Sequence, residues 1–250
     1  MAMNYSWNWG VLLQPTGVGN EVYWQWLLTG FKWLLVIGGS GWLIALIIGT
    51  ILGIMRTLPN KTARAIGTAY VSFFRNIPLL IQLFFWFYVA PTWLTPALQK
   101  WWFQELDPNT SAVISASIGL GLFTAARIAE QVRTGIESLP KGQINAAYAL
   151  GFTLPQTYRH IVLPQAFRVI LPPMSSELTN CFKNASVASL VGVTELISQT
   201  KTISEYTQNN IEVYTFTTII YLLFNLVLIY FMTWLEKKLR IKGQIDGGGA

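Results

Sequence analysis

Charged side chains lie inside several long apolar runs of this 250-residue chain. Arg127 and Glu130, in the string GLFTAARIAEQVR, are three residues apart, so on a helix they can share a face and partly neutralise each other. Charges inside a membrane are costly and commonly mark substrate or ion pathways. Because an arginine can hold a carboxylate through two hydrogen bonds in a dry site, Arg127 is our first candidate for binding an anionic ligand. A structural pair with Glu130 is the competing interpretation.

A second group of polar residues surrounds a proline. In FFRNIPLLIQ, Arg75, Pro78 and Gln82 are spaced to share one helix face. Pro78 should kink that helix and free backbone groups to meet partners or a ligand. An interface anchor near the helix end is the favoured role for Arg75.

A polar stripe follows the 165–198 segment and consists of Glu177, Asn180, Lys183 and Asn184. Lys183 is our second candidate for an anion contact, although it could equally satisfy helix carbonyls at a dimer interface. We predict that six polar residues line a substrate pathway: Arg127, Glu130, Lys183, Arg75, Gln82 and Asn180.

Catalytic residue types are scarce. The run Gly38-Gly39-Ser40-Gly41 fits the G-x-S-G string of intramembrane serine proteases, but such an enzyme needs a histidine base on a neighbouring span. The single histidine, His160, lies in a polar loop instead. One histidine and one cysteine make no metal cluster, and no phosphate-binding G-x-x-x-x-G-K-[ST] loop occurs. We expect no catalytic residue and no metal, and we interpret the run, like Gly49-x-x-x-Gly53, as close helix packing.

The composition places these residues in a membrane protein, with 52% hydrophobic and 11% charged residues. A span needs roughly 20 apolar residues. Four runs approach or exceed that length, at 27–55, 66–94, 111–129 and 213–235. A fifth, at 165–198, is weaker because Pro172, Pro173 and the polar stripe interrupt it.

Basic residues decide whether the fifth run crosses, because cytoplasmic loops are rich in lysine and arginine. They gather at 56–64, at 133–159 and in the tail 237–250, whereas 1–26, 93–110 and 199–212 hold only Lys100 and Lys201. The loop at 133–159 and the tail therefore lie on the same, cytoplasmic side of the membrane. Since the 213–235 run crosses once between them, the fifth run must cross as well. We predict five transmembrane helices within 27–236, a periplasmic segment 1–26, a cytoplasmic tail 237–250 with a disordered glycine-rich end, and a short outer helix at 95–106. The net charge of +6 follows from the inner loops and is no argument for nucleic acid.

The loop at 141–164, called the knob below, is polar and predicts two short helices. Residues 143–150 favour a helix that Gly151 ends, because glycine accepts the left-handed conformation of a C-cap. Thr153 and Gln156 form a capping box for a second helix, and Pro155 is tolerated in its first turn. Pro164 should end or kink this second helix.

The knob resembles the cytoplasmic loop of bacterial ABC-importer permeases, whose pattern is EAA, three residues, Gly, nine residues, I-x-L-P. The residues that carry the match, with Asn in place of the leading Glu, are Asn145, Ala146, Ala147, Gly151, Ile161, Leu163 and Pro164. The strings FFRNIPLLIQ, GLFTAAR, EQVR, LPKGQ and FKNAS extend the resemblance to permeases of polar amino-acid importers. Within them the chain is most similar to a membrane subunit of glutamate/aspartate importers.

This resemblance implies an all-α, type I ABC-importer permease fold of five transmembrane helices plus a coupling-helix loop in a bacterial inner membrane. It also implies two ABC ATPase subunits that contact the seven knob residues, a second permease, paralogous or identical, and a periplasmic amino-acid-binding protein. The partner ATPase would use the ATP, and this chain, surrounded by membrane lipid, would bind no cofactor and be no enzyme.

The resemblance leaves the substrate open. An acidic amino acid, glutamate or aspartate, is the favoured cargo, and Arg127 after Ala126 agrees with that subgroup because many relatives carry an aromatic residue there. Asn145 in place of Glu could soften one contact with the ATPase. The alternatives are a permease for a neutral polar or basic amino acid, or a stand-alone secondary transporter.

Overall fold

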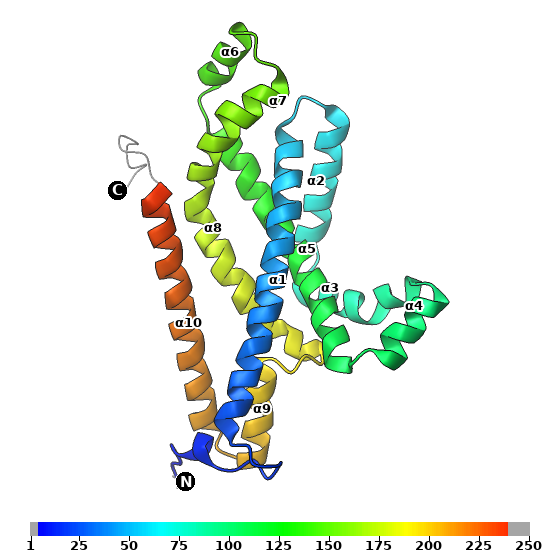
Figure 1. The fold of residues 1–250 in the computed structure, drawn as a ribbon, viewed down its shortest axis with the longest axis vertical. Helices are drawn as coiled ribbons and strands as arrows, with labels where there is room; N and C mark the ends of the chain where they lie inside the picture. Colours follow the sequence, from blue (N-terminus) through cyan, green and yellow to red (C-terminus); the bar gives the residue numbers. More distant parts are fainter. Residues whose placement is uncertain (1–4, 240–250) are drawn as a thin grey trace.

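The computed structural model describes residues 5–239, and within that range every regular element is helical. Four long helices form its body: α1 (Tyr23–Thr57), α5 (Pro108–Glu137), α8 (Leu163–Ala185) and α10 (Asn210–Leu239). Figure 1 shows them running lengthwise between two ends of an elongated molecule. Of the described helices, α1, α5 and α10 are each long and apolar enough to cross a membrane. Most of the predicted tail, residues 240–250 with their basic and glycine residues, lies outside the described part.

The bundle is built on α1 and α5, which pack against each other more extensively than any other described pair. Glycines allow this approach: a Cβ added at Gly49 or Gly53 would lie 2.7 or 2.8 Å from a backbone oxygen of α5. A Cβ at Gly38 would lie 2.2 Å from the Phe182 ring of α8, and the Ser40 hydroxyl donates to a carbonyl of its own helix at 2.6 Å. The small-residue runs therefore are packing surfaces, as predicted.

The predicted span at 66–94 is broken. α2 (Lys61–Asn76) stops before Pro78, and α3 (Leu79–Phe84) leaves at a bend of 102°. The proline forces the residue before it into extended backbone and cannot donate a helical hydrogen bond. The predicted effect of Pro78 is confirmed, but the common face predicted for Arg75 and Gln82 is wrong, because the break puts them on different helices.

Beyond α3 the chain forms an arm that projects sideways from the bundle (Figure 1). The arm contains η2 (Phe85–Val89), η3 (Ala90–Trp93), α4 (Pro96–Lys100) and η4 (Trp101–Glu105), so a helix does form within the predicted range 95–106. Trp93 and Trp101 are exposed on it. Its place at the outer membrane surface stays a prediction.

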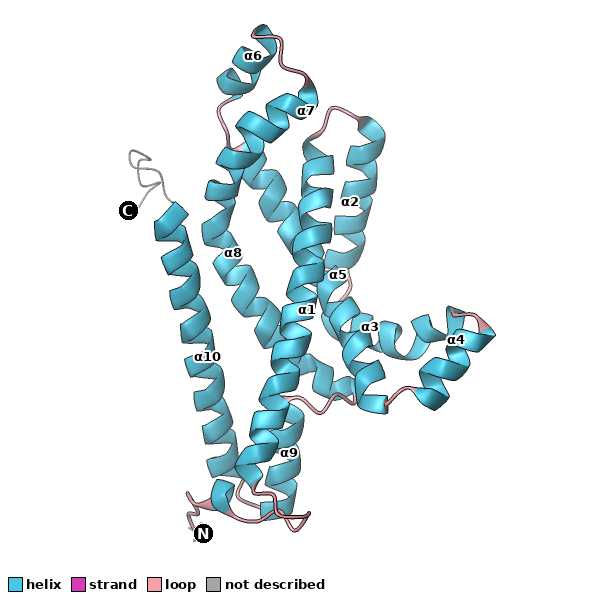
Figure 2. Cartoon of the chain, viewed as in Figure 1, coloured by secondary structure: helices cyan, strands magenta, loops and turns pink. Residues whose placement is uncertain are grey.

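The knob lies at one end of the bundle, where α6 (Lys141–Ala149) and α7 (Leu154–Thr157) meet at a sharp corner (Figure 2). Gly151 has φ +82°, and the N–H of Phe152 reaches back to the carbonyl of Ala147, as in a Schellman C-cap. The Gln156 side chain accepts from the N–H of Thr153 at 2.9 Å. These predicted local features are confirmed.

The second knob helix does not end at Pro164. It continues through η5 (Tyr158–Val162), a π-helical turn, directly into α8. The irregular turn lies just before Pro164, which occupies the first turn of α8, where a missing N–H is tolerated. We predicted that Pro164 would end or kink the second knob helix, and the predicted helix end is wrong.

The opposite end of the bundle holds the N-terminal segment with η1 (Val11–Leu13) and α9 (Leu196–Thr207). α8 continues into η6 (Ser186–Val191), and the chain then turns at Gly192 and leads into α9, so the helical run predicted at 165–198 stops short. α8 is not apolar enough to be recognised as a span by composition, yet it runs beside α5 along the bundle. The α1–α2 turn, the knob and the described end of α10 lie toward the other end, which groups the basic loops as predicted.

Candidate functional site

Arg127 of α5 forms a bidentate ion pair with Glu177 of α8. Its Nε donates to Glu177 Oε2 at 2.6 Å and its Nη2 donates to Oε1 at 3.1 Å. The Glu177 side chain is 7% exposed, whereas that of Arg127 is 40% exposed. The pair therefore joins two helices and leaves part of the guanidinium accessible. Two N–H groups of one guanidinium that bind both oxygens of a carboxylate form a strong and directional contact.

The pair between Arg127 and Glu130, the competing interpretation of Arg127, does not form. Glu130 instead binds Arg56 of α1, with Nη1 to Oε2 at 2.5 Å, and Arg133 of its own helix. Two residues three positions apart on a helix point about 300° apart around its axis, that is, about 60° from each other. They share one broad face, but they can still contact different neighbouring helices. Arg127 leans toward α8 and Glu130 toward α1. The sequence showed Glu177 in the polar stripe but gave no sign that it was the partner of Arg127.

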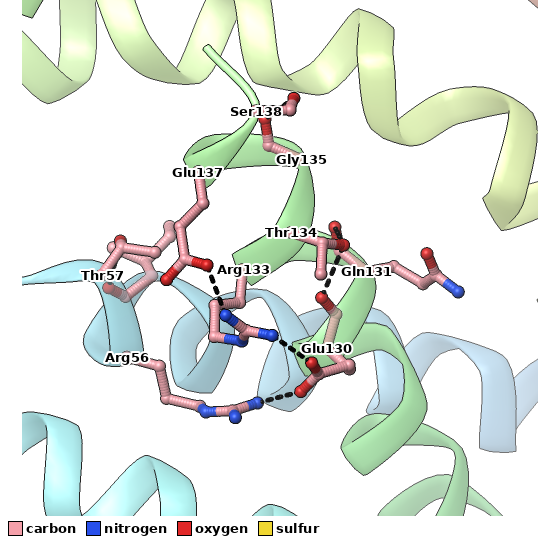
Figure 3. A network of polar contacts seen from close by, with 10 residues as sticks. Arg56, Thr57, Glu130, Gln131, Arg133, Thr134, Gly135, Glu137 and Ser138 are labelled. Atoms are coloured by element: carbon pink, nitrogen blue, oxygen red, sulfur yellow. Dashed lines mark hydrogen bonds and ion pairs between the residues drawn. The ribbon is translucent and has the colours of Figure 1, made fainter. Parts of the chain in front are cut away.

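Glu130 belongs to a separate polar network near the knob. Figure 3 shows Arg56 and Arg133 on either side of the Glu130 carboxylate, with Arg133 also paired to Glu137 one turn further along α5. The Arg56 side chain is 11% exposed. Both carboxylate oxygens of Glu130 are therefore already paired with cations, one from α1 and one from α5.

Gln82 has a structural task in this fold. Its Nε2 donates to the carbonyls of Phe74 and Ile77, both at 2.9 Å. These carbonyls belong to the end of α2, which the break at Pro78 would otherwise leave unsatisfied. Gln82 is buried and therefore secures the bend, while Arg75 is exposed near the end of α2. The structure does not bring these two residues to Arg127.

Lys183 lies apart from the Arg127–Glu177 pair. It is exposed and lines a groove of about 520 Å³ between α8 and α10, together with Thr218 and Asn225. Asn180, half-buried, lies one helical turn beyond Glu177. The predicted pathway residues therefore divide among the α5–α8 contact, the α8–α10 groove, the network near the knob and the bend after α2.

The knob presents a surface of mixed chemistry. Ala147 is buried inside it, whereas Asn145, Ala146 and Gly151 are exposed. Farther along, Pro164 is exposed, while Ile161 and Leu163 are half-buried toward the bundle. Three large apolar side chains that the motif does not include are also exposed: Tyr148, Leu150 and Phe152. Leu150 is 78% exposed. Exposed apolar groups gathered on a polar loop are typical of a docking surface.

Comparison with known proteins gives a consistent result. The family described as "Binding-protein-dependent transport system inner membrane component" matches residues 22–241. The glutamate/aspartate import permease protein GltJ of Escherichia coli K12 is 43% identical over 245 residues, which cover 98% of this chain and 100% of GltJ. The glutamate/aspartate import permease protein GltK of Escherichia coli O6:H1 is 30% identical over 213 residues, 85% of this chain and 92% of GltK.

Solved structures agree on the fold. A chain of a crystal structure described as an amino acid ABC transporter with histidines superposes with a TM-score of 0.69. The two sequences are 24% identical, and the match covers 86% of this chain and 95% of that one. The expected type I permease fold and the membrane character of the chain are therefore confirmed.

Proposed function

The chain belongs to the family of inner membrane components of binding-protein-dependent transport systems, and on this premise we propose that it forms half of the pathway through which an ATP-driven importer moves glutamate or aspartate. The high similarity to GltJ along nearly the whole chain supports the acidic cargo. The half-exposed Arg127, held by a buried carboxylate, is the single structural observation that supports it most directly.

Arg127 is the residue we assign to the substrate carboxylate. Glu177 accepts hydrogen bonds from two of its N–H groups. A carboxylate of the substrate can bind the exposed part of the guanidinium or displace Glu177 from it, since the two acids have the same chemistry. Lys183 and Asn180 extend the proposed pathway along α8 toward the end that holds α9.

The partners follow from the knob. Two ATPase subunits bind and hydrolyse ATP, and each contacts one permease through the knob surface that contains Ala146, Gly151 and Leu150. This chain binds no cofactor and carries no catalytic residue. The second permease is a paralogue, which the similarity to both GltJ and GltK supports. A periplasmic binding protein delivers the substrate to the end that holds the N-terminus and α9, so the knob faces the cytoplasm.

The proposed cycle is alternating access between two arrangements of the permease pair. Closure of the ATPase subunits moves the knobs, turns the pathway outward and receives the substrate. Hydrolysis and reopening turn it inward and release the substrate.

Purification of the tagged chain from its native membrane in mild detergent, followed by uptake measurements in proteoliposomes, tests this function. We expect a stoichiometric ATPase and a second permease to co-purify, and glutamate uptake to require ATP and the binding protein. Uptake that proceeds without ATP would favour a secondary transporter. ATP-driven uptake of a neutral or basic amino acid, with glutamate excluded, would overturn the acidic cargo while keeping the importer.

A further inference from the structure

The knob is joined covalently to only two long helices. α5 leads into it and α8 leads out of it, whereas α1, the longest helix, is separated from it by more than 80 residues of sequence. Any movement of the knob must therefore reach α1 through non-covalent contacts. The geometry of one residue, Tyr158, supplies such a contact.

Tyr158 lies in η5, directly after the second knob helix. Its hydroxyl donates to the carbonyl oxygen of Thr57 at 3.0 Å and lies 3.1 Å from the Thr57 hydroxyl. Thr57 is the last residue of α1, where helix carbonyls have no partner within the helix. The Tyr158 ring packs in the same apolar cluster as Ile54 and Val162. The contact therefore combines a helix-end hydrogen bond with a packed ring.

The residue before Thr57 forms an ion pair between helices. The neighbouring residue Arg56 binds Glu130 of α5 at 2.5 Å, as Figure 3 shows beside Thr57. Gly67 of α2 leaves space for the Arg56 stem, because a Cβ there would lie 2.6 Å from Arg56 Cγ. Arg56 is thus held between α2 and α5, and its position depends on where the end of α1 lies.

We propose that Tyr158, Thr57, Arg56 and Glu130 form a relay that carries displacement of the knob to α1 and across to α5. Tyr158 is a positioning residue in this relay and touches neither substrate nor nucleotide. The relay rests on the proposed importer function, because it needs a partner that moves the knob. It adds a specific task for residues outside the knob motif: without the hydroxyl of Tyr158, movement of the knob would displace α1 less.

The test uses the whole transporter, with ATPase, second permease and binding protein, in proteoliposomes. Substrate uptake and ATP hydrolysis are measured together for Tyr158→Phe, which keeps the packed ring. We expect uptake per ATP hydrolysed to fall about fivefold, the factor that one net hydrogen bond of about 1 kcal/mol represents. Complex assembly and thermal midpoint should stay close to the wild type. Tyr230→Phe, on an exposed face of α10 outside the knob, is the matched control and should keep the wild-type ratio.

A double variant separates a relay from general loosening of the structure. Residues that act in series lose function together, so Tyr158→Phe combined with Arg56→Gln should be no worse than the more affected single variant. Losses that multiply would overturn the relay, as would a wild-type ratio in Tyr158→Phe. These outcomes are distinct from failure of the proposed function, in which the wild-type complex itself would show no ATP-driven uptake.

Discussion

Replacing Arg127 alone would give an ambiguous result, because the arginine joins α5 to α8 in the structure and is also the proposed contact for the substrate. Its removal leaves Glu177, 7% exposed, without its cationic partner. Loss of one member of a buried pair typically costs about 3–5 kcal/mol of folding free energy. Arg127 itself is 40% exposed, so solvent screens the remaining charge and we take the lower end, about 3 kcal/mol. Arg127→Ala would therefore reduce uptake partly by unfolding the subunit.

The double variant Arg127→Gln with Glu177→Gln removes that ambiguity. Two amides of similar shape can hydrogen-bond across the same gap, and replacing a buried ion pair by neutral groups is often close to neutral for stability. We expect the single variant Arg127→Gln to lower the thermal midpoint of the purified complex and the double variant to restore most of it.

Uptake kinetics of the double variant then report on the substrate. A hydrogen bond to a charged group contributes about 1.5–3 kcal/mol, so loss of the guanidinium should weaken glutamate affinity roughly 10- to 150-fold. Binding of glutamate to the isolated binding protein should not change. Our reasoning fails if the double variant is stable and transports glutamate with the wild-type apparent affinity, because Arg127 would then be a structural residue alone.

Three further predictions test the fold and the knob. Gly151→Asp should uncouple ATP hydrolysis from uptake, because a side chain is strained at φ +82° by about 1–2 kcal/mol. Gly142→Asp adds the same charge to the knob at an ordinary helical φ, so this variant should stay coupled. Gly53→Leu should destabilise the α1–α5 contact by about 1–3 kcal/mol or more, seen as a lower thermal midpoint, while Gly39→Leu, with open space around its Cβ, should not; equal midpoints would contradict the packing argument. Gln82→Leu should lose two hydrogen bonds at the bend and about 1–3 kcal/mol, and an unchanged midpoint would show that the bend holds without it.

The features that the sequence predicted correctly are local in origin. The corner at Gly151 and the bond between Gln156 and Thr153 depend on residues within five positions of each other, so their chemistry is visible in the sequence alone. The long apolar helices follow from composition over some twenty residues. Pro78 was recognised as a disruption, but the hydrogen bonds by which Gln82 folds back onto α2 were not, because a single sequence does not show where a side chain turns.

Ion-pair partners could not be predicted, because helix crossings choose them. Spacing within one helix suggested Glu130 as a possible partner of Arg127. The close packing of α1 on α5, which Gly49 and Gly53 permit, instead brings Arg56 to Glu130. The contact of α8 with α5 similarly brings Glu177 to Arg127. A pair within a helix gains only about 0.2–0.5 kcal/mol, so a better-buried partner on a neighbouring helix readily replaces it.

α5 connects the two proposed sites, and this has a consequence for transport. One of its charges, Arg127, is tied to α8, and another, Glu130, is tied to α1. In the proposed cycle, movement of the knob would displace α8 and, through the relay, α1, so the same event would act on both ion pairs of α5. A substrate carboxylate that competed with Glu177 for Arg127 would weaken the pair with α8 and change how easily the knob moves. Linkage then requires the reverse effect, that the position of the knob changes the affinity for substrate. Coupling in this protein would thus depend on α5 having two partners, and not on the knob alone.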